Sequence, residues 1–267
     1  MSIDRRKFIK ASGLAALGFV VTSPKKLLAS EETPAVDSTA VQQVPATDGK
    51  PLVGSRWAMV IDLKKCLQEE GCTDCVDACN IVHNVPKFDN RKDEIKWIWK
   101  EKFHNAFEDE GHEYLEEHVL HTQIPILCNH CDNPPCVRVC PTQATWKREK
   151  DGIVMMDWHR CIGCRYCVAA CPYGSRSFNW RDPRPFIDKI NPEFPTRTRG
   201  VVEKCTFCEE RLAKGKLPSC VEACKAKAIL FGDLEDPESE IRKVLAENFT
   251  IRRKPGLGTQ PEIYYIV

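Results

Sequence analysis

The chain has 267 residues, of which 42% are hydrophobic and 29% charged, and its formal net charge is +1. This composition is typical of a soluble globular protein with one large domain or two small ones. The near-neutral charge gives no argument for nucleic-acid binding. Sixteen cysteines stand out from this ordinary background, and their spacing carries the functional information.

The first 30 residues have the features of an export signal. The twin arginines Arg5 and Arg6 precede the apolar run 11–21, which is well below the ~20 residues that a membrane-spanning helix needs. A cleavage point is expected near Ala29 or Ser30. We predict that residues 1–30 direct export by the twin-arginine route, to the periplasm or the outer face of the cytoplasmic membrane. The alternative is a cytoplasmic protein with a basic N-terminal helix.

The next segments predict a linker followed by short strands. Residues 31–55 are rich in Pro, Ala, Thr and Val without periodicity, which is typical of a flexible linker. The segment 57–62 reads as a strand that leads into the first group of cysteines. Similar segments at 152–157 and 200–203 precede later groups of cysteines, so the element recurs as an internal repeat.

Two short helices and an insertion complete the predicted elements. A helix is expected at 209–214, where Gly215 ends it. A second helix is expected to begin at Asp236, with Ile241, Val244 and Leu245 on one apolar face. Residues 80–123 contain no cysteine and are interpreted as an insertion.

The sixteen cysteines form four clumps of four. The clumps are Cys66, Cys72, Cys75 and Cys79; Cys128, Cys131, Cys136 and Cys140; Cys161, Cys164, Cys167 and Cys171; and Cys205, Cys208, Cys220 and Cys224. Three cysteines two residues apart can wrap one corner of a compact iron–sulfur cube, and a fourth that precedes Pro reaches a neighbouring cluster. The third clump has this spacing without adjustment, and the first is the least regular. The count predicts four fully ligated [4Fe-4S] clusters.

Other uses of the cysteines fit less well. Structural zinc takes two Cys pairs separated by a longer spacer, and runs with two, two and three intervening residues do not suit one tetrahedral ion. An exported protein would normally pair its cysteines as disulfides, but thiolates already bound to iron are not free to oxidise. Zinc sites and a disulfide framework therefore remain the weaker alternatives.

The count of sixteen cysteines for four clusters indicates electron transfer rather than catalysis. Full ligation leaves no open iron for a substrate, and no cysteine remains as a nucleophile. The sequence contains no Gly-rich nucleotide loop, so NAD or flavin is not expected. We predict no catalytic site in this chain. A catalytic iron–sulfur enzyme and a redox-silent metal scaffold are the alternatives.

Several polar and aromatic residues invite a functional reading. His130, between two cysteines, is expected to make a hydrogen bond rather than to bind metal. The histidines of the insertion are expected on the surface, because no Cys-x-x-Cys-His haem motif occurs; they are His83, His104, His112 and His118, with His121 at its end. Trp97 and Trp99 suit either the core or a docking patch.

Basic residues lie near the cysteines and in one loop. Arg176, Arg181 and Arg184 suit either anionic partner groups or a solvated loop. A further set lies beside cysteines and is expected to offset cluster charge; the set is Lys65, Arg160, Lys204 and Lys225.

From residue 57 to 267 the sequence resembles the four-cluster ferredoxin-like subunits of the dimethyl-sulfoxide-reductase superfamily. The resemblance rests on the four clumps in this order, on 128–136 (CNHCDNPPC), on 231–237 (FGDLEDP) and on 257–261 (LGTQP). In that family the clumps exchange their fourth ligands, second with third and first with fourth. The resemblance therefore implies four ligand sets: Cys128, Cys131, Cys136 and Cys171; Cys161, Cys164, Cys167 and Cys140; Cys66, Cys72, Cys75 and Cys224; and Cys205, Cys208, Cys220 and Cys79.

The implied fold is α+β, with two ferredoxin-like modules related by a pseudo-two-fold axis, each around two [4Fe-4S] clusters. Residues 56–125 would form the first half of an outer module, with the insertion 80–123. Residues 126–185 would form an inserted module, and 186–267 the second half of the outer module with a C-terminal extension.

Within that family, three segments are similar to the exported iron–sulfur subunits of the sulfite-reduction-associated Dsr transmembrane complex, the DsrO type. They are 83–86 (HNVP), 96–100 (KWIWK) and 171–184. The resemblance implies membrane association through an NrfD-type quinone-interacting membrane subunit, with a multihaem cytochrome c or another redox subunit as second partner. The alternative is the electron-transfer subunit of an exported molybdoenzyme, nitrite reductase or hydrogenase complex.

Overall fold

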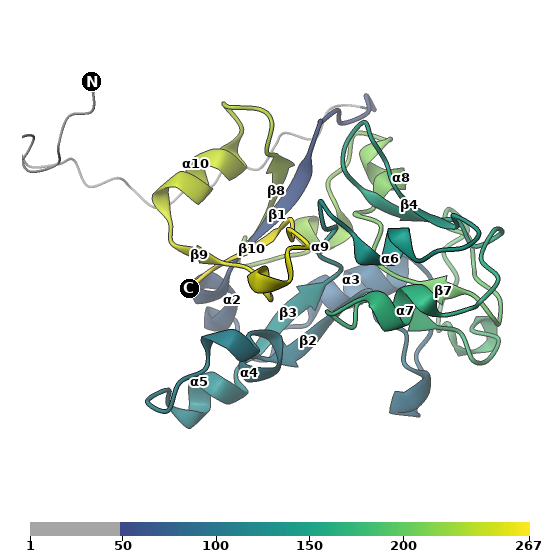
Figure 1. Ribbon diagram of the computed structural model, residues 1–267, viewed down its shortest axis with the longest axis horizontal. Coiled ribbons are helices and arrows are strands. Elements are labelled where there is room, and N and C mark those ends of the chain that lie inside the picture. The colour runs from purple at the N-terminus through teal and green to yellow at the C-terminus, as the bar shows by residue number, and fades with distance from the viewer. Residues whose placement is uncertain (1–48) are drawn as a thin grey trace, which may run out of the picture. The chain divides into compact units, whose positions relative to one another are not determined.

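A computed structural model describes residues 49–267, which form many short helices and strands (Figure 1). The predicted export signal and most of the predicted linker lie outside the described residues. The last linker residues contact the folded part, since the backbone N–H of Leu52 donates to the carbonyl of Leu212 at 2.8 Å. No helix in residues 49–267 has the length and apolar character needed to cross a membrane.

The largest sheet has four strands in the order β8-β1-β10-β9. Its strands are β1 (Trp57–Asp62), β8 (Ile229–Asp233), β9 (Thr250–Ile251) and β10 (Ile263–Ile266). β1 pairs antiparallel with β8 and parallel with β10, and the predicted strand at 57–62 is confirmed. Met59 and Ile61 pack into the main core, whereas Ala58 and Val60 belong to a second cluster. Both faces of β1 are therefore covered, which explains its nearly continuous apolar sequence.

Helix α10 (Glu240–Glu247) covers the second face of this sheet (Figure 1). Its Ile241 is fully buried against β1 and β8. The helix was expected to begin at Asp236, and this boundary is wrong. The Asp236 carboxylate instead accepts the N–H of Glu238 in a preceding turn, and Ser239 is the residue before the first helical turn.

The predicted insertion is an antiparallel strand pair that carries a small helical lobe. β2 (Ile98–Lys102) pairs with β3 (Gln123–Leu127). Between them lie α4 (Phe103–Ala106), η2 (Glu108–Glu110) and α5 (Glu117–His121). Residues 103–121, named here the acidic lobe, form the lower left of Figure 1.

Smaller elements surround the second and third cysteine clumps. Two antiparallel pairs and two helices make up this part: β4 (Thr145–Lys147), β5 (Val154–Met156), β6 (Ser177–Phe178), β7 (Val202–Glu203), α6 (Pro135–Arg138) and α7 (Tyr166–Ala170). The strands expected at 152–157 and 200–203 are confirmed as β5 and β7. Their apolar side chains form a separate small core that includes several cysteines.

The first and fourth clumps lie in and beside helices that meet in space. Three cysteines of the first clump lie in α2 (Leu63–Gln68) and α3 (Asp74–Val82). Of the fourth clump, Cys220 lies in α9 (Ser219–Glu222), and Cys208 directly precedes α8 (Glu209–Leu212). α3 packs on α9. α8 confirms the helix expected at 209–214. Single turns at η1 (Arg91–Asp93), η3 (Arg184–Phe186) and η4 (Pro255–Leu257) complete the element order.

A buried ion pair connects the predicted insertion with the segments before and within β7. Arg197 and Glu203 are both completely buried side chains, and their Nη2 and Oε2 atoms are 2.6 Å apart. Glu203 also accepts the indole N–H of Trp97 at 2.9 Å and the amide of Asn179 at 2.6 Å. Arg197 donates to the carbonyl of His83. Every charge is thus met by a partner, as a buried ion pair requires.

Candidate metal centres

The sixteen thiols are free of disulfides and gather in four groups of four. Each group draws three cysteines from one clump and one from another. We name them group A (Cys66, Cys72, Cys75, Cys224), group B (Cys79, Cys205, Cys208, Cys220), group C (Cys128, Cys131, Cys136, Cys171) and group D (Cys140, Cys161, Cys164, Cys167).

Groups C and D each line a small cavity. The four thiols of group C surround one cavity together with Tyr173 and Arg176. Those of group D surround another, with Ile162 and Gly163 in its wall. Cys171 and Cys140 have therefore changed places, because each lies with the three cysteines of the other clump.

The cysteines of groups A and B lie in α2, α3 and α9 and in the segments beside these helices and α8. Burial raises the pKa of Cys75 to about 12, and nearby Cys66, Cys224 and Cys72 add to the rise. Burial also raises the pKa of Cys220 well above its ordinary value, together with Cys208, Cys79 and Cys205. Such crowding makes four thiolates unfavourable unless a cation lies between them.

The donor set fits an iron–sulfur cluster in each group. Thiolates are the ligands of [4Fe-4S] clusters, and four per site is the required number. Backbone N–H groups point at sulfur in groups A and B. Ala228 donates to Cys224 Sγ at 3.2 Å, and Phe207 and Ser219 donate to Cys205 and Cys208, each at 3.4 Å. Hydrogen bonds of this kind support thiolate ligands.

The four groups follow one another in a line. Cys75 of group A is close enough to Cys220 of group B to raise its pKa further beyond the effect of burial. Burial raises the pKa of Cys205 in group B, and the nearby Cys128 of group C raises it further. Burial also raises the pKa of Cys167 in group D, and the nearby Cys136 of group C adds to this rise. The order is therefore A, B, C, D.

Group D depends on one glycine. Gly163 has a φ of +70°, and a Cβ added there would lie 2.3 Å from the carbonyl oxygen of Gly200. No other residue fits this position without moving the backbone. The loop between Cys161 and Cys164 is thus pressed against the segment that precedes β7.

Buried basic side chains lie between neighbouring thiol groups, at positions named here the junctions of the line. Arg176, 4% exposed, donates through Nη2 to Cys136 Sγ at 3.0 Å and to Thr145 Oγ1 at 2.8 Å. Burial would lower the pKa of Arg176, but the neighbouring Cys136, Cys167 and Cys128 raise it above its ordinary value. Arg176 therefore stays charged between groups C and D.

Lys204 holds the corresponding place between groups B and C. It is completely buried, and its ammonium donates to the carbonyls of Cys205, at 2.5 Å, and of Val154. Burial lowers the pKa of Lys204, whereas the nearby Cys128 and Cys205 thiols oppose that effect. At group A, Lys100 Nζ lies 3.7 Å from Cys66 Sγ.

Known proteins are similar to this chain over the segments that carry the cysteines. Residues 119–184 and 191–234 match the 4Fe-4S dicluster domain. The chain is 40% identical to the Hdr-like menaquinol oxidoreductase iron-sulfur subunit 1 of Archaeoglobus fulgidus, covering 98% of this chain and 97% of that protein. The chain belongs to this family of ferredoxin-like iron–sulfur subunits.

Two further relatives widen the family. The menaquinone reductase iron-sulfur cluster-binding subunit of Nitratidesulfovibrio vulgaris is 38% identical over 79% of this chain and 88% of its own length. The protein NrfC of Escherichia coli is 38% identical over 100% of this chain and 96% of its own length. These relatives and the mixed helix and strand fold establish an iron–sulfur electron-transfer subunit.

Two histidines of the iron–sulfur subunit are buried beside cysteines. His130 accepts the N–H of Val154 at 3.2 Å and stacks on Phe207, which confirms the expected hydrogen bond. His83 was expected on the surface, and this prediction is wrong. It is 1% exposed, stacks on Trp97 and places Nδ1 3.5 Å from Cys79 Sγ.

His83 also links group B to a carboxylate. Its Nε2 lies 3.0 Å from Glu210 Oε1, and candidate ligand atoms of His83, Cys208 and Glu210 lie within 4.8 Å of one another. Because Cys208 already belongs to group B, His83 and Glu210 surround that group rather than form a separate site. The sequence signal for this role was the short spacing from Cys79 to His83 on one helix face.

The tryptophans and most of the basic residues singled out in the sequence lie in the core or in ion pairs. Trp97 and Trp99 are buried, so they belong to the core. Arg181 pairs with Asp93 at 3.0 Å, and Arg184 pairs with Asp182. Of the basic residues expected near clusters, Lys204 is buried at a junction, whereas Lys65 and Lys225 form partly exposed ion pairs and Arg160 is exposed.

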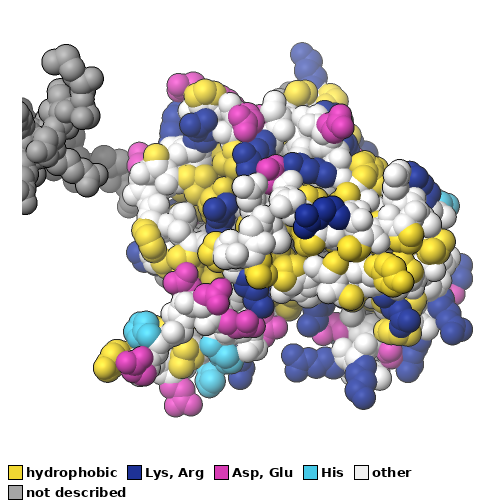
Figure 2. All heavy atoms as spheres, in the orientation of Figure 1, with side chains coloured by type: hydrophobic (Ala, Val, Ile, Leu, Met, Phe, Trp, Pro, Cys, Tyr) yellow, Lys and Arg dark blue, Asp and Glu magenta, His cyan; other side chains and the backbone are white. Residues whose placement is uncertain are grey.

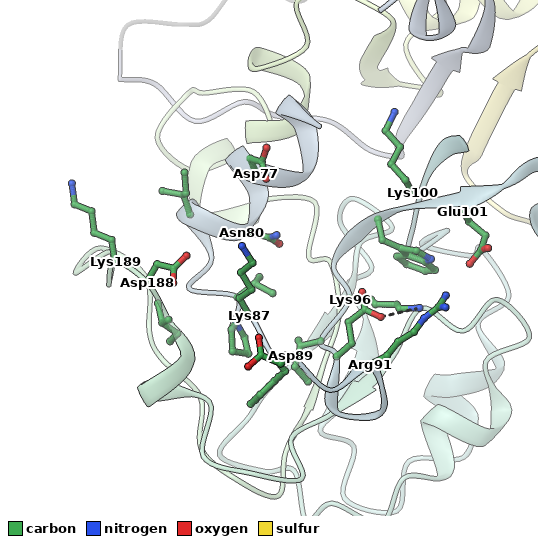
Figure 3. Close-up of a pocket in the computed structure, with 18 residues that line it drawn as sticks. Asp77, Asn80, Lys87, Asp89, Arg91, Lys96, Lys100, Glu101, Asp188 and Lys189 are labelled. Carbon is green, nitrogen blue, oxygen red and sulfur yellow. Dashed lines mark ion pairs between the residues drawn. The ribbon is translucent and has the colours of Figure 1, made fainter. Parts of the chain in front are cut away.

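A cleft of about 900 Å³ lies between α3, the segment before β2 and the loop at 187–189 (Figure 3). Its wall alternates in charge, with Lys87, Lys189 and Asp89 among the residues drawn, and Lys96 pairs with Glu94 at 3.5 Å. No cysteine lines it. The alternating charges give it no preference for an anion or a cation.

Proposed function

We propose that this iron–sulfur subunit carries four [4Fe-4S] clusters, one in each of groups A to D, and conducts single electrons along them. The observation that carries the proposal is the grouping of the sixteen thiols in four sets of four, in which each set lies close to the next in the order A, B, C, D. When bound, such a cluster takes up or releases one electron.

The exposure of the thiols supports a conductor with two ends. All four thiols of group B and three of group C are buried. Three thiols of group A and three of group D are only partly buried. Electrons would therefore enter and leave at groups A and D, while the interior groups are shielded from solvent.

The chain's own residues perform three tasks in this proposal. The cysteines hold the clusters at fixed separations. Backbone N–H groups and Arg176 donate hydrogen bonds to the cysteine Sγ atoms. Arg176 and Lys204 balance negative charge where water is excluded. The exchange of Cys140 with Cys171, and of Cys79 with Cys224, supports two ferredoxin-like modules, one around groups C and D and one around groups A and B.

Iron and acid-labile sulfide analysis tests the cluster count. We expect about sixteen irons and a similar amount of sulfide per chain, with no zinc. About twelve irons would mean that one group holds a different metal or cluster. Zinc, or a folded protein without metal, would overturn the proposal.

We further propose that the partners are an NrfD-type quinone-interacting membrane subunit and a multihaem cytochrome c, as in a Dsr-type complex. The names of the relatives, which include menaquinol and menaquinone oxidoreductase subunits, support a quinone-linked partner. Gentle solubilisation and affinity isolation of the subunit should yield a membrane protein and haem c without molybdenum. Molybdenum in the isolated complex would instead indicate the electron-transfer subunit of a molybdoenzyme.

Export by the twin-arginine route is part of the proposal. The support is the sequence around Arg5 and Arg6, ahead of a protein that must fold around its clusters before transport. Replacing both arginines with lysine should retain the protein in the cytoplasm, as shown by cell fractionation. An unchanged distribution would contradict this route.

A further inference from the structure

A large groove lies beside group A, at one end of the line. It has a volume of about 1120 Å³, and Cys66 and Cys72 are part of its wall together with Lys100. The acidic lobe supplies one side through Leu115 and Val119. The thiols of the proposed terminal cluster are thus accessible from the groove.

The opposite rim of the groove exposes apolar side chains. Phe249 is 76% exposed, Leu67 46% and the C-terminal Val267 38%. All three line the groove. Apolar side chains gathered around an accessible redox centre are typical of a protein-docking surface.

The same end of the molecule is acidic. The acidic lobe, residues 103–121, contains six Asp or Glu and no Lys or Arg. Figure 2 shows acidic and histidine side chains gathered over this lobe. Glu69, Glu70 and Glu110 continue the negative charge along the groove, where Lys64 and Lys100 are the basic residues in its wall.

The other end of the line has the opposite charge. The segments 133–148 and 158–181, which carry six of the eight cysteines in groups C and D, contain seven Lys or Arg and no Asp or Glu. Arg138, Arg160 and Arg165 are exposed there. The line of clusters therefore runs from an acidic end at group A to a basic end at group D.

We propose that the groove beside group A docks a positively charged electron-transfer protein, with the partner's redox centre facing Cys66 and Cys72. This inference rests on the proposed function, because it assigns a partner to one end of the conductor. A second copy of this chain would bring the same acidic rim, and an anionic membrane surface would be repelled by it. One electron crosses the interface, so the donor is oxidised and the acceptor reduced by one, and no bond or proton changes.

The test uses the iron-loaded protein, reduced with dithionite and mixed in a stopped-flow instrument with ferric cytochrome c. Native cytochrome c is cationic, and succinylated cytochrome c is its anionic counterpart. We expect the cationic form to react at least about tenfold faster at low ionic strength, with an advantage that falls as salt is added. Visible absorption of the clusters and the iron content report that each variant is intact.

Two matched variants locate the effect. Glu69→Lys/Glu70→Lys/Glu110→Lys reverses three exposed charges of the groove. Glu149→Lys/Glu193→Lys/Glu238→Lys makes the same change in net charge at exposed positions that do not line it. We expect the groove variant to lose the preference for the cationic form, and the control variant to keep most of it. A triple change of the groove residues to Gln should give an intermediate loss without introducing new positive charge.

Each other outcome has a definite meaning. Equal loss in both lysine variants would attribute the preference to overall charge and overturn the docking groove. A wild-type protein that reacts equally fast with both cytochromes would also overturn it. If the iron-loaded protein transfers no electrons to either cytochrome, the proposed function fails instead.

Discussion

Removal of the buried charge at Arg176 should lower the reduction potentials of the clusters in groups C and D. The substitution Arg176→Met keeps a long side chain of similar reach but deletes the guanidinium that lies 3.0 Å from Cys136 Sγ. A reduced cluster carries one more negative charge than an oxidised cluster. A nearby cation therefore stabilises the reduced form, and its loss makes reduction harder.

The expected size follows from the geometry. A cluster held by group C would spread the added electron over the cube, beyond the 3.0 Å between Arg176 Nη2 and Cys136 Sγ. A mean separation of roughly 6 Å with an effective dielectric constant of about 20 would give ~3 kcal/mol. For a one-electron couple this corresponds to roughly 120 mV. Relaxation of the surroundings reduces the effect, and we expect shifts between about 50 and 120 mV.

Potentiometric titration followed by electron paramagnetic resonance measures these shifts directly. Arg176→Lys retains the charge and should move the potentials much less. Arg165→Met removes an exposed arginine near group D and controls for net charge. The reasoning would be refuted if the iron content of Arg176→Met were normal and no potential fell by more than about 20 mV. It would also be refuted if only the clusters of groups A and B shifted.

Four other perturbations test the structure. Gly163→Ala forces a Cβ against the carbonyl of Gly200, so about four irons per chain should be lost, and a full iron content would show that the loop can move. Cys140→Ser and Cys164→Ser should alter the same paramagnetic species, since both thiols line one cavity; changes in two different species would contradict this grouping. Glu203→Leu should lower the free energy of unfolding by about 3–5 kcal/mol, because it leaves a buried guanidinium unpaired. An unchanged denaturant midpoint would mean that the ion pair is dispensable. Removal of iron by a chelator should abolish the cooperative thermal transition, and a persistent one would show that the polypeptide folds without clusters.

The sequence predicted the elements whose signals are local. The strand at 57–62 is mostly apolar, and a glycine follows the helix expected at 209–214, so both elements could be located, although α8 ends at Leu212 and residues 213–215 form a turn. The beginning of α10 was misplaced because Asp236 and Pro237 resemble a helix start. In the structure the Asp236 side chain caps a turn instead. Local patterns identify the type of element better than its boundary.

The residues that surround the thiols could not be found in this way. Arg176 and Cys136 are 40 positions apart, and Lys204 meets a carbonyl 50 positions away. No periodicity or motif links such pairs, so Arg176 suited a solvated loop as well as any other place. His83 was misjudged for the same reason, since its burial depends on Trp97 and Phe194 packing around it.

In the proposed conductor, these distant contacts would determine how readily the interior groups accept an electron. Burial of groups B and C removes them from water, which disfavours the more negatively charged, reduced form of any cluster they hold. Without compensation, interior potentials would fall below those at the partly exposed ends, and an electron entering at either end would meet a barrier. Lys204 and Arg176 lie at the junctions where this penalty is largest, and both are almost inaccessible to solvent. In the proposed conductor, the buried cations would offset in the interior what water provides at the ends, so that burial would protect the clusters without interrupting the path.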